Sequence, residues 1–233
     1  MSGAAREVLT FATAEFAERT AALIAETIRA TASVRDRCRM VLAGGRTPAS
    51  VYRVLAQRTG IPWAQVDIFV GDERCVPRDH PDSNYRMIRE TLLDTVPGPK
   101  PLVHPLQVES GGEAAAMEYT MRIAALPEPK FDFVLSGVGA DGHTASLFPG
   151  DARVMTAPTW AMTAAAPPPF PVPERVGLTL RALNSTRVQC VLCTGADKQA
   201  VRTRILGTAS DGATLPAALL SGLERTIWIV DPM

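Results

Sequence analysis

Short apolar runs alternate along the chain with segments whose apolar residues recur at helical spacing. The runs cover residues 39–43, 66–70, 131–136, 188–194 and 226–230, and each of the first four is followed by glycine. Because these runs lack polar alternation, they predict strands that are buried on both faces, as in a parallel sheet. Helical spacing predicts helices over 13–28, 47–57, 83–93, 113–126 and 197–206.

Strands that alternate with helices are typical of an α/β fold. We predict a doubly wound, mostly parallel sheet with helices on both faces, in a Rossmann-like arrangement. Thr47 followed by Pro48 is expected to form the N-cap and first residue of a helix. The proline-rich segment 167–173 is a candidate linker between domains. The segments on both sides of it fit one sheet, so we expect an ordered surface crossing and a single domain over 1–233.

The charge composition of the chain disfavours polyanionic partners. The chain has 24 Lys and Arg against 24 Asp and Glu, so its formal net charge is zero. A neutral chain gives no global attraction for nucleic acid or an anionic membrane surface. No stretch reaches the roughly 20 apolar residues of a membrane span, and no secretory signal precedes the cysteines. We therefore expect a cytoplasmic protein with reduced thiols, in which Cys190 and Cys193 are buried structural residues.

Four glycine-containing turns follow the predicted strands, and each carries a charged or hydroxyl group. They cover residues 44–48, 71–74, 137–143 and 195–198. The carboxyl ends of parallel strands share one edge of a sheet, and ligands bind at that edge in open α/β folds. Four such turns at one edge therefore predict a binding site.

The third turn formally matches the G-x-G-x-x-G pattern of dinucleotide-binding proteins. Asp141 stands just before its third glycine, and Pro149 follows too soon for a long crossover helix. No acidic residue ends a strand about 20 residues later, as ribose recognition would need. The sequence therefore favours a ligand other than a dinucleotide.

His143 is the candidate catalytic residue of this turn. It lies two residues after Asp141, and an adjacent acid can fix the tautomer of an imidazole and raise its basicity. The other histidines, His80 and His104, show no ligand spacing to it. We therefore expect a general base and no metal.

Basic groups on the same turns indicate a small anionic substrate. Arg46, Arg74 and Lys198 each lie beside a glycine in a chain without net charge. A glycine-rich loop that runs into a helix, with a lysine nearby, suits phosphate. No serine stands in a G-x-S-x-G elbow and the cysteines have no evident base, so water is the expected nucleophile.

Taken in order, these segments resemble the 6-phosphogluconolactonase family over nearly the whole chain. The matching segments are 43–48, 71–77 with 83–85, 137–149, 174–179 and 195–198, of which 137–149 is the most specific. The resemblance implies a sugar-phosphate isomerase type of fold and hydrolysis of 6-phosphogluconolactone in the pentose phosphate pathway. It also implies that no cofactor is used.

The resemblance implies roles for individual residues as well. His143 would be the general base and Asp141 its orienting partner, while Arg74 would lie near the sugar or the developing negative charge. The groups that would hold the phosphate are Gly44, Gly45, Arg46, Thr47, Arg175 and Lys198. The expected partner is a small sugar-phosphate lactone, and the sequence leaves the oligomeric state open, with a monomer plausible.

Two alternatives remain open at this point. The related glucosamine-6-phosphate deaminases share the glycine-Thr-Pro loop and the Asp-Gly-His turn, but carry a catalytic Glu just after it. Here that run is Leu147-Phe148-Pro149, which favours a lactonase. A non-catalytic sugar-phosphate sensor is the other alternative. It would need a further binding module, and no segment of the sequence resembles one.

Overall fold

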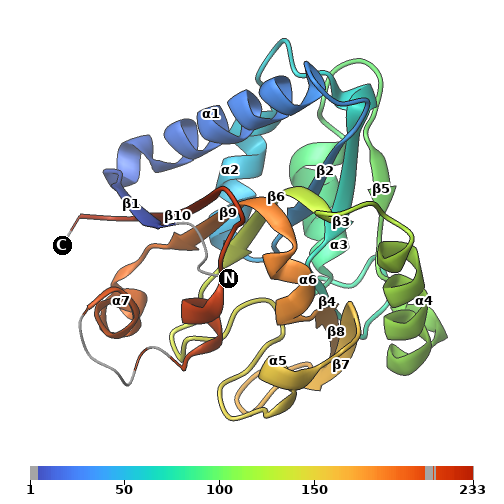
Figure 1. The fold of residues 1–233 in the computed structure, drawn as a ribbon, viewed down its shortest axis with the longest axis vertical. Coiled ribbons are helices and arrows are strands. Elements are labelled where there is room, and N and C mark those ends of the chain that lie inside the picture. The colour runs from blue at the N-terminus through green and yellow to red at the C-terminus, as the bar shows by residue number, and fades with distance from the viewer. Residues whose placement is uncertain (1–4, 208–211, 213, 233) are drawn as a thin grey trace.

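The computed structural model describes residues 5–207, 212 and 214–232. Its main sheet has seven strands in the order β1-β10-β9-β6-β2-β3-β5, all paired in parallel (Figure 1). The strands are β1 (Arg6–Thr10), β2 (Cys38–Leu42), β3 (Val66–Val70), β5 (Leu102–His104), β6 (Phe131–Gly137), β9 (Thr186–Cys193) and β10 (Arg225–Val230). This architecture confirms the predicted α/β class.

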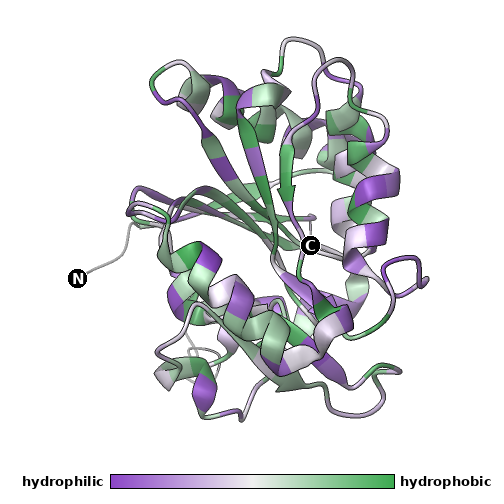
Figure 2. Ribbon diagram, turned by 90° about the vertical axis from the view of Figure 1, so that its right-hand side faces the viewer, coloured by the Kyte–Doolittle hydropathy of each residue, from purple (hydrophilic) through white to green (hydrophobic). Residues whose placement is uncertain are grey.

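Helices cover both faces of the main sheet, as a doubly wound fold requires. One face packs against α1 (Thr13–Ala32), α2 (Arg46–Ala56) and α3 (Asn84–Ile88), which continues as a π-helical turn over Arg89–Leu93. The other face packs against α4 (Gly112–Ala124), α5 (Arg153–Thr156), α6 (Leu180–Asn184) and α7 (Gln199–Leu206). Figure 2 shows hydrophobic residues concentrated on the central strands between these layers.

The alternation of side chains along β9 shows how one strand supplies two cores. Cys190 and Leu192 belong to the core under α1 and α2, whereas Val191 and Cys193 belong to the core under α6 and α7. Residues three apart on a strand point to opposite faces. Cys190 and Cys193 are therefore buried on different sides of the sheet, and all four cysteines of the chain are free thiols.

A second sheet, not predicted from the sequence, lies beside the main one. It consists of β4 (Asp72–Arg74), β8 (Glu174–Leu178) and β7 (Ala161–Ala165), paired antiparallel in that order. Only Gly71 separates β3 from β4, so the small sheet starts where a main-sheet strand ends. The proline-rich segment 167–173 joins β7 to β8 within this sheet.

Most predicted elements agree with the structure to within a residue or two, but α1 extends to Ala32, four residues beyond its predicted end, and the N-cap of α2 differs from the predicted Thr47. Helix α2 begins at Arg46, and Gly45 is its N-cap with φ of 102°. Thr47 therefore lies in the first turn and is not the cap. A positive φ favours glycine at that position, so the glycine and not the hydroxyl residue determines where this helix starts.

The strand order places a crevice between β2 and β6. From β2 the chain continues to β3 and β5 on one side, and it returns to β6, β9 and β10 on the other. At such a reversal the loops after the two neighbouring strands diverge and leave room for a ligand. The loops that begin at Ala43 and at Val138 therefore flank the crevice.

Candidate active site

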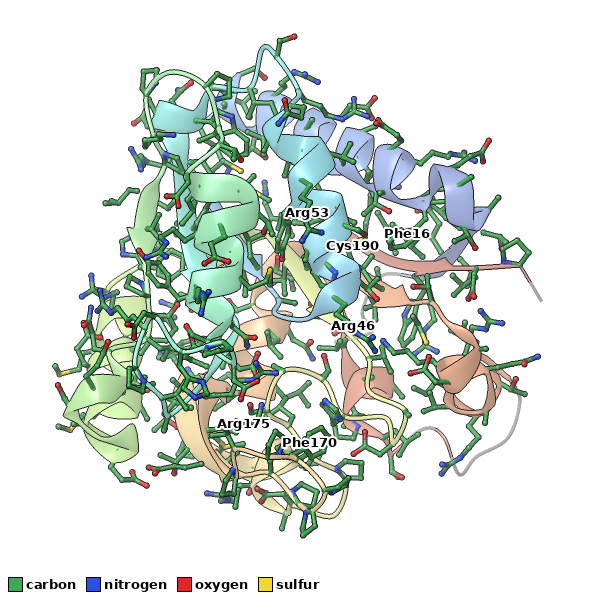
Figure 3. The ribbon with its side chains drawn as sticks, turned by 180° about the vertical axis from the view of Figure 1, so that it is seen from behind. Phe16, Arg46, Arg53, Phe170, Arg175 and Cys190 are labelled. Atoms are coloured by element: carbon green, nitrogen blue, oxygen red, sulfur yellow. The ribbon has the colours of Figure 1, made fainter. Side chains whose placement is uncertain are left out.

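A cavity of about 510 Å³ lies at the carboxyl edge of the main sheet, within the size range of small-molecule sites. Every candidate residue from the sequence lines it: Gly44, Gly45, Arg46, Thr47, Arg74, Asp141, His143, Arg175 and Lys198. They come from the segments that follow β2, β6 and β9, including the first turn of α2, and from strands β4 and β8 of the small sheet. In Figure 3, Arg46 lies at the start of α2, with Arg175 and Phe170 close together below it.

The turn after β6 presents the imidazole of His143 to the cavity. The Gly139 amide donates to the His143 carbonyl oxygen at 2.9 Å, which closes the turn. A Cβ at Gly139 would lie 2.1 Å from the His143 ring, so only glycine fits there. The imidazole Nδ1 lies 2.6 Å from Asp141 Oδ1. Because a carboxylate only accepts, Nδ1 carries the proton in the neutral ring and Nε2 is the basic nitrogen.

Asp141 is suited to hold this orientation. Its Oδ1 also accepts the His143 backbone amide at 3.1 Å. Partial burial opposes ionisation of the carboxyl, but the hydrogen bonds and charge of His143 outweigh it and lower the pKa of Asp141. The carboxylate is therefore ionised throughout the neutral range.

Two arginines lie directly opposite each other across the small sheet. In the antiparallel β4–β8 pair, Arg74 is the register partner of Arg175. Like charges in that position repel. Arg175 is only 5% exposed; burial lowers its pKa, and the charge of Arg74 lowers it further. Among the described residues, Arg74 Nε is buried without a hydrogen-bond partner. A bound anion would offset both the repulsion and the unpaired donor.

A buried polar network supports the glycine loop after β2. Asn84 Nδ2 donates to the carbonyl oxygen of Asp72 at 2.8 Å and to its Oδ1 at 3.1 Å. Ser146 Oγ donates to the other carboxylate oxygen at 2.7 Å. Asn84 packs so closely on Gly44 that a Cβ there would lie 1.9 Å from Asn84 Oδ1. Asn84 and Asp72 also line the cavity, and the sequence analysis assigned neither of them a role.

Glu73 connects β4 to the start of α3. Its buried carboxylate accepts the backbone amides of Arg74, Asn84 and Tyr85 at 2.7–2.9 Å, and the Ser83 hydroxyl at 3.0 Å. Burial raises the pKa of Glu73 although these four donors act in the opposite direction. The acid in the Gly71–Arg74 turn is thus a structural group that fixes the backbone of Arg74 and Asn84.

Phe148 and Phe170 were also missed by sequence reasoning. The His143 ring centroid lies 5.1 Å from that of Phe148 and 5.4 Å from that of Phe170. Phe148 belongs to the Leu-Phe-Pro run after the histidine turn, and Phe170 lies within the proline-rich segment. That segment lines the cavity, so the predicted surface crossing forms part of the wall of the site.

The remaining histidines occupy other places. His104 stacks on Phe69 with ring centroids 4.2 Å apart, and His80 Nδ1 accepts the Asp82 amide at 3.1 Å. Over the residues that the structure describes, no group of three or more His, Cys, Asp and Glu side chains could hold a metal ion. In the same residues, no helix is long and apolar enough to cross a membrane.

Comparison with known proteins places this chain in a family. The family described as glucosamine-6-phosphate isomerases/6-phosphogluconolactonase matches residues 12–228, and the chain belongs to it. A 6-phosphogluconolactonase of Mycobacterium leprae is 36% identical over 219 residues, which cover 89% of this chain and 88% of that protein. One from Thermotoga maritima is 36% identical over 196 residues, or 84% of this chain and 85% of that protein.

Solved structures agree with this assignment. The crystal structure of 6-phosphogluconolactonase from Thermotoga maritima superposes with a TM-score of 0.87 and 31% identity, covering 98% of this chain and all of that one. The 6-phosphogluconolactonase of Trypanosoma brucei gives a TM-score of 0.83 at 32% identity, covering 99% and 97%. The main sheet and the small sheet together therefore form the architecture of this family.

The contact between Gly44 and Asn84 yields a test of the glycine loop. Gly44→Ala should displace the buried Asn84 amide and destabilise the fold by about 1–3 kcal/mol, as overpacking does. It should also weaken binding of 6-phosphogluconate, because the loop borders the cavity. Thermal unfolding and calorimetric titration measure the two effects. Gly137→Ala is the matched control for stability, because a Cβ there meets no atom within 4 Å; equal stability of the two variants would refute the contact.

Proposed function

We propose that this protein is a single-domain enzyme over residues 1–233 that hydrolyses 6-phospho-D-glucono-1,5-lactone to 6-phosphogluconate, a step of the pentose phosphate pathway. The observation that carries the proposal is the composition of the cavity. An ionised Asp141 orients the His143 imidazole in the same cavity that contains Arg74, Arg175 and Lys198. The relatives named 6-phosphogluconolactonase support the same reaction.

In the proposed reaction, His143 Nε2 takes a proton from a water molecule as its oxygen attacks the lactone carbonyl carbon. The carbonyl oxygen becomes the oxyanion of a tetrahedral intermediate. The intermediate then collapses, the bond to the ring oxygen breaks, and the imidazolium returns its proton to that oxygen. General base assistance contributes about 10²–10⁴-fold. Donors aimed at the oxyanion, here Arg74, contribute about 10²-fold more.

The phosphate would bind away from the reacting carbon and fix the orientation of the lactone. We assign it to the Gly44–Thr47 loop, Arg175 and Lys198. Arg175 and Lys198 are partly or wholly withdrawn from solvent, which strengthens a charge-assisted hydrogen bond. Arg46 is exposed at the start of α2 and would guide the anion inward.

The residue next to the histidine turn argues against a deaminase. The related deaminases carry a catalytic Glu just after this turn. Here Phe148 packs its ring against His143, so the base borders an apolar group where the deaminase has an acid. We further propose a cytoplasmic protein without cofactor, metal, nucleic-acid or membrane partner. The balanced charge and the free, mostly buried thiols support this part of the proposal.

The direct test of this function is a lactonase assay on the purified protein. Its rate is measured against spontaneous opening of the lactone, and ammonia release from glucosamine 6-phosphate is measured in parallel. Catalysed opening of the phosphorylated lactone without ammonia release supports the proposal. Binding of 6-phosphogluconate without turnover would show a sensor instead.

The general base can be tested by His143→Ala. Turnover should fall by about 10²–10⁴-fold, while affinity for 6-phosphogluconate stays close to that of the wild type. His80→Ala, outside the cavity, is the matched control. A His143→Ala variant with wild-type turnover would rule out the assigned base.

The phosphate site can be tested by Lys198→Ala and Arg175→Ala. Each removes a charge-assisted contact of about 1.5–3 kcal/mol, so KM for the phosphorylated lactone should rise roughly 10- to 100-fold. Unphosphorylated gluconolactone should be a poor substrate of the wild type for the same reason. Arg19→Ala, at an exposed position on α1, should leave KM for the phosphorylated lactone and the preference over unphosphorylated gluconolactone unchanged. If the wild type hydrolyses both lactones equally well, the assignment of the phosphate site is wrong.

Metal independence stays a prediction. A metallohydrolase lowers the pKa of a metal-bound water to obtain its nucleophile, whereas the proposed imidazole base needs no ion. Full activity should therefore remain after exhaustive chelation, as measured by the lactonase assay together with elemental analysis. Loss of activity that zinc or manganese restores would make His143 a metal ligand.

A further inference from the structure

The segment between β7 and β8 forms a stiff wall of the cavity. This proline loop, residues 166–173, contains five prolines, which restrict the backbone. The Ala166 amide donates to the Pro173 carbonyl oxygen at 2.7 Å and closes the base of the loop. A second bond, from the Phe170 amide to the Pro167 carbonyl oxygen at 3.2 Å, shapes its tip. Phe170 is the aromatic residue that this loop holds against the site.

The ring of Phe170 contacts both the His143 imidazole and the Arg175 guanidinium. It meets the His143 ring edge to face, with centroids 5.4 Å apart and an interplanar angle of 87°. The guanidinium carbon of Arg175 lies 5.7 Å from the centroid of the same ring, within cation–π range. Figure 3 shows Phe170 and Arg175 side by side. One side chain therefore contacts the proposed base and a proposed phosphate ligand.

These contacts restrict two side chains whose orientation matters for catalysis. Asp141 Oδ1 lies 2.6 Å from Nδ1 of the imidazole, and the rings of Phe148 and Phe170 pack against the imidazole. Arg175 Nε donates to the Val172 carbonyl oxygen of the proline loop at 2.8 Å. That bond leaves the two Nη groups of Arg175 for a ligand. The loop thus orients the guanidinium through Val172 and Phe170 together.

We propose that Phe170 is a positioning residue that couples phosphate binding at Arg175 to the orientation of the His143 imidazole. The inference rests on the proposed function, because it assumes a phosphorylated substrate and a histidine base. When a phosphate binds Arg175 and fixes its side chain, the guanidinium also fixes the ring of Phe170. That ring then holds the imidazole in the orientation in which it activates the attacking water. The phosphate would then contribute to turnover as well as to binding.

Phe148 provides a matched comparison. Its ring packs against the same imidazole, and against Phe170 at 5.7 Å, but the Arg175 guanidinium lies over Phe170. Phe148→Leu should therefore lower kcat with KM for the phosphorylated lactone unchanged. Phe170→Leu should lower kcat by about tenfold and also raise KM about three- to tenfold. Phe170→Tyr, which keeps the ring, should restore both values.

The decisive experiment supplies the lactone and the anion as two separate molecules. Unphosphorylated gluconolactone is supplied as substrate, and inorganic phosphite is added as the missing anion. We expect phosphite to accelerate turnover by the wild type, Phe148→Leu and Phe170→Tyr, and to have little effect on Phe170→Leu at saturation. Circular dichroism and thermal unfolding confirm that each variant is folded. If Phe170→Leu does not fold, the comparison of Phe170→Tyr with wild type and the wild-type response to phosphite decide the question.

Two results would overturn the inference. One is a Phe170→Leu variant that is activated by phosphite as strongly as the wild type. The other is a wild-type enzyme that hydrolyses the phosphorylated lactone but does not respond to phosphite. In both cases the proposed function stands. A wild type that does not hydrolyse the phosphorylated lactone at all refutes the function itself, so the two failures are distinguishable.

Discussion

The reversal of strand order between β2 and β6 determines where this protein can bind a ligand. All seven strands of the main sheet run in the same direction, so their carboxyl ends share one edge. At the β2–β6 boundary the loops that follow two adjacent strands lead away from each other. The glycine loop after β2 and the histidine turn after β6 therefore face one cavity from opposite sides. The small antiparallel sheet closes the same cavity with Arg74 and Arg175.

A pair of facing arginines in this cavity suits it to an anionic ligand. The register of β4 and β8 places two arginines opposite each other, one of them almost fully buried. That arrangement costs stability without a ligand, because desolvated like charges repel. The charges of Asp72, Asp82 and Glu73 offset part of this repulsion at Arg175, but burial and the charge of Arg74 still lower the pKa of Arg175. A dianionic phosphate would stabilise the two arginines, so the repulsion between them favours binding of the proposed substrate.

The main sheet could be predicted from the sequence because its central strands are buried on both faces and read as continuous apolar runs. The edge strands β1 and β5 could not, since their residues are exposed or half-buried and form no such run. The small sheet was missed for a different reason. Strands β4 and β8 are about 100 residues apart in the chain and are short, so only the folded structure shows that they pair.

The candidate site shows the same division. His143, Asp141 and the basic residues of the loops could be predicted because they lie in glycine-containing turns after strands. Such turns can be recognised from the local sequence. Arg175 entered only through the family resemblance, because its partner across the sheet is distant in sequence. Phe170 lies among prolines that look like a connecting segment, and its contacts with His143 and Arg175 depend on tertiary structure alone.

We propose that the cavity binds its substrate in one orientation, with the phosphate at Arg175 and Lys198 and the lactone carbonyl at His143. A crystal structure with bound 6-phosphogluconate tests this most directly. We expect the phosphate in contact with Arg175 and Lys198, and the newly formed carboxylate within hydrogen-bond distance of His143 Nε2. A product bound in the opposite orientation, with its phosphate against His143, would contradict the proposed roles of these residues.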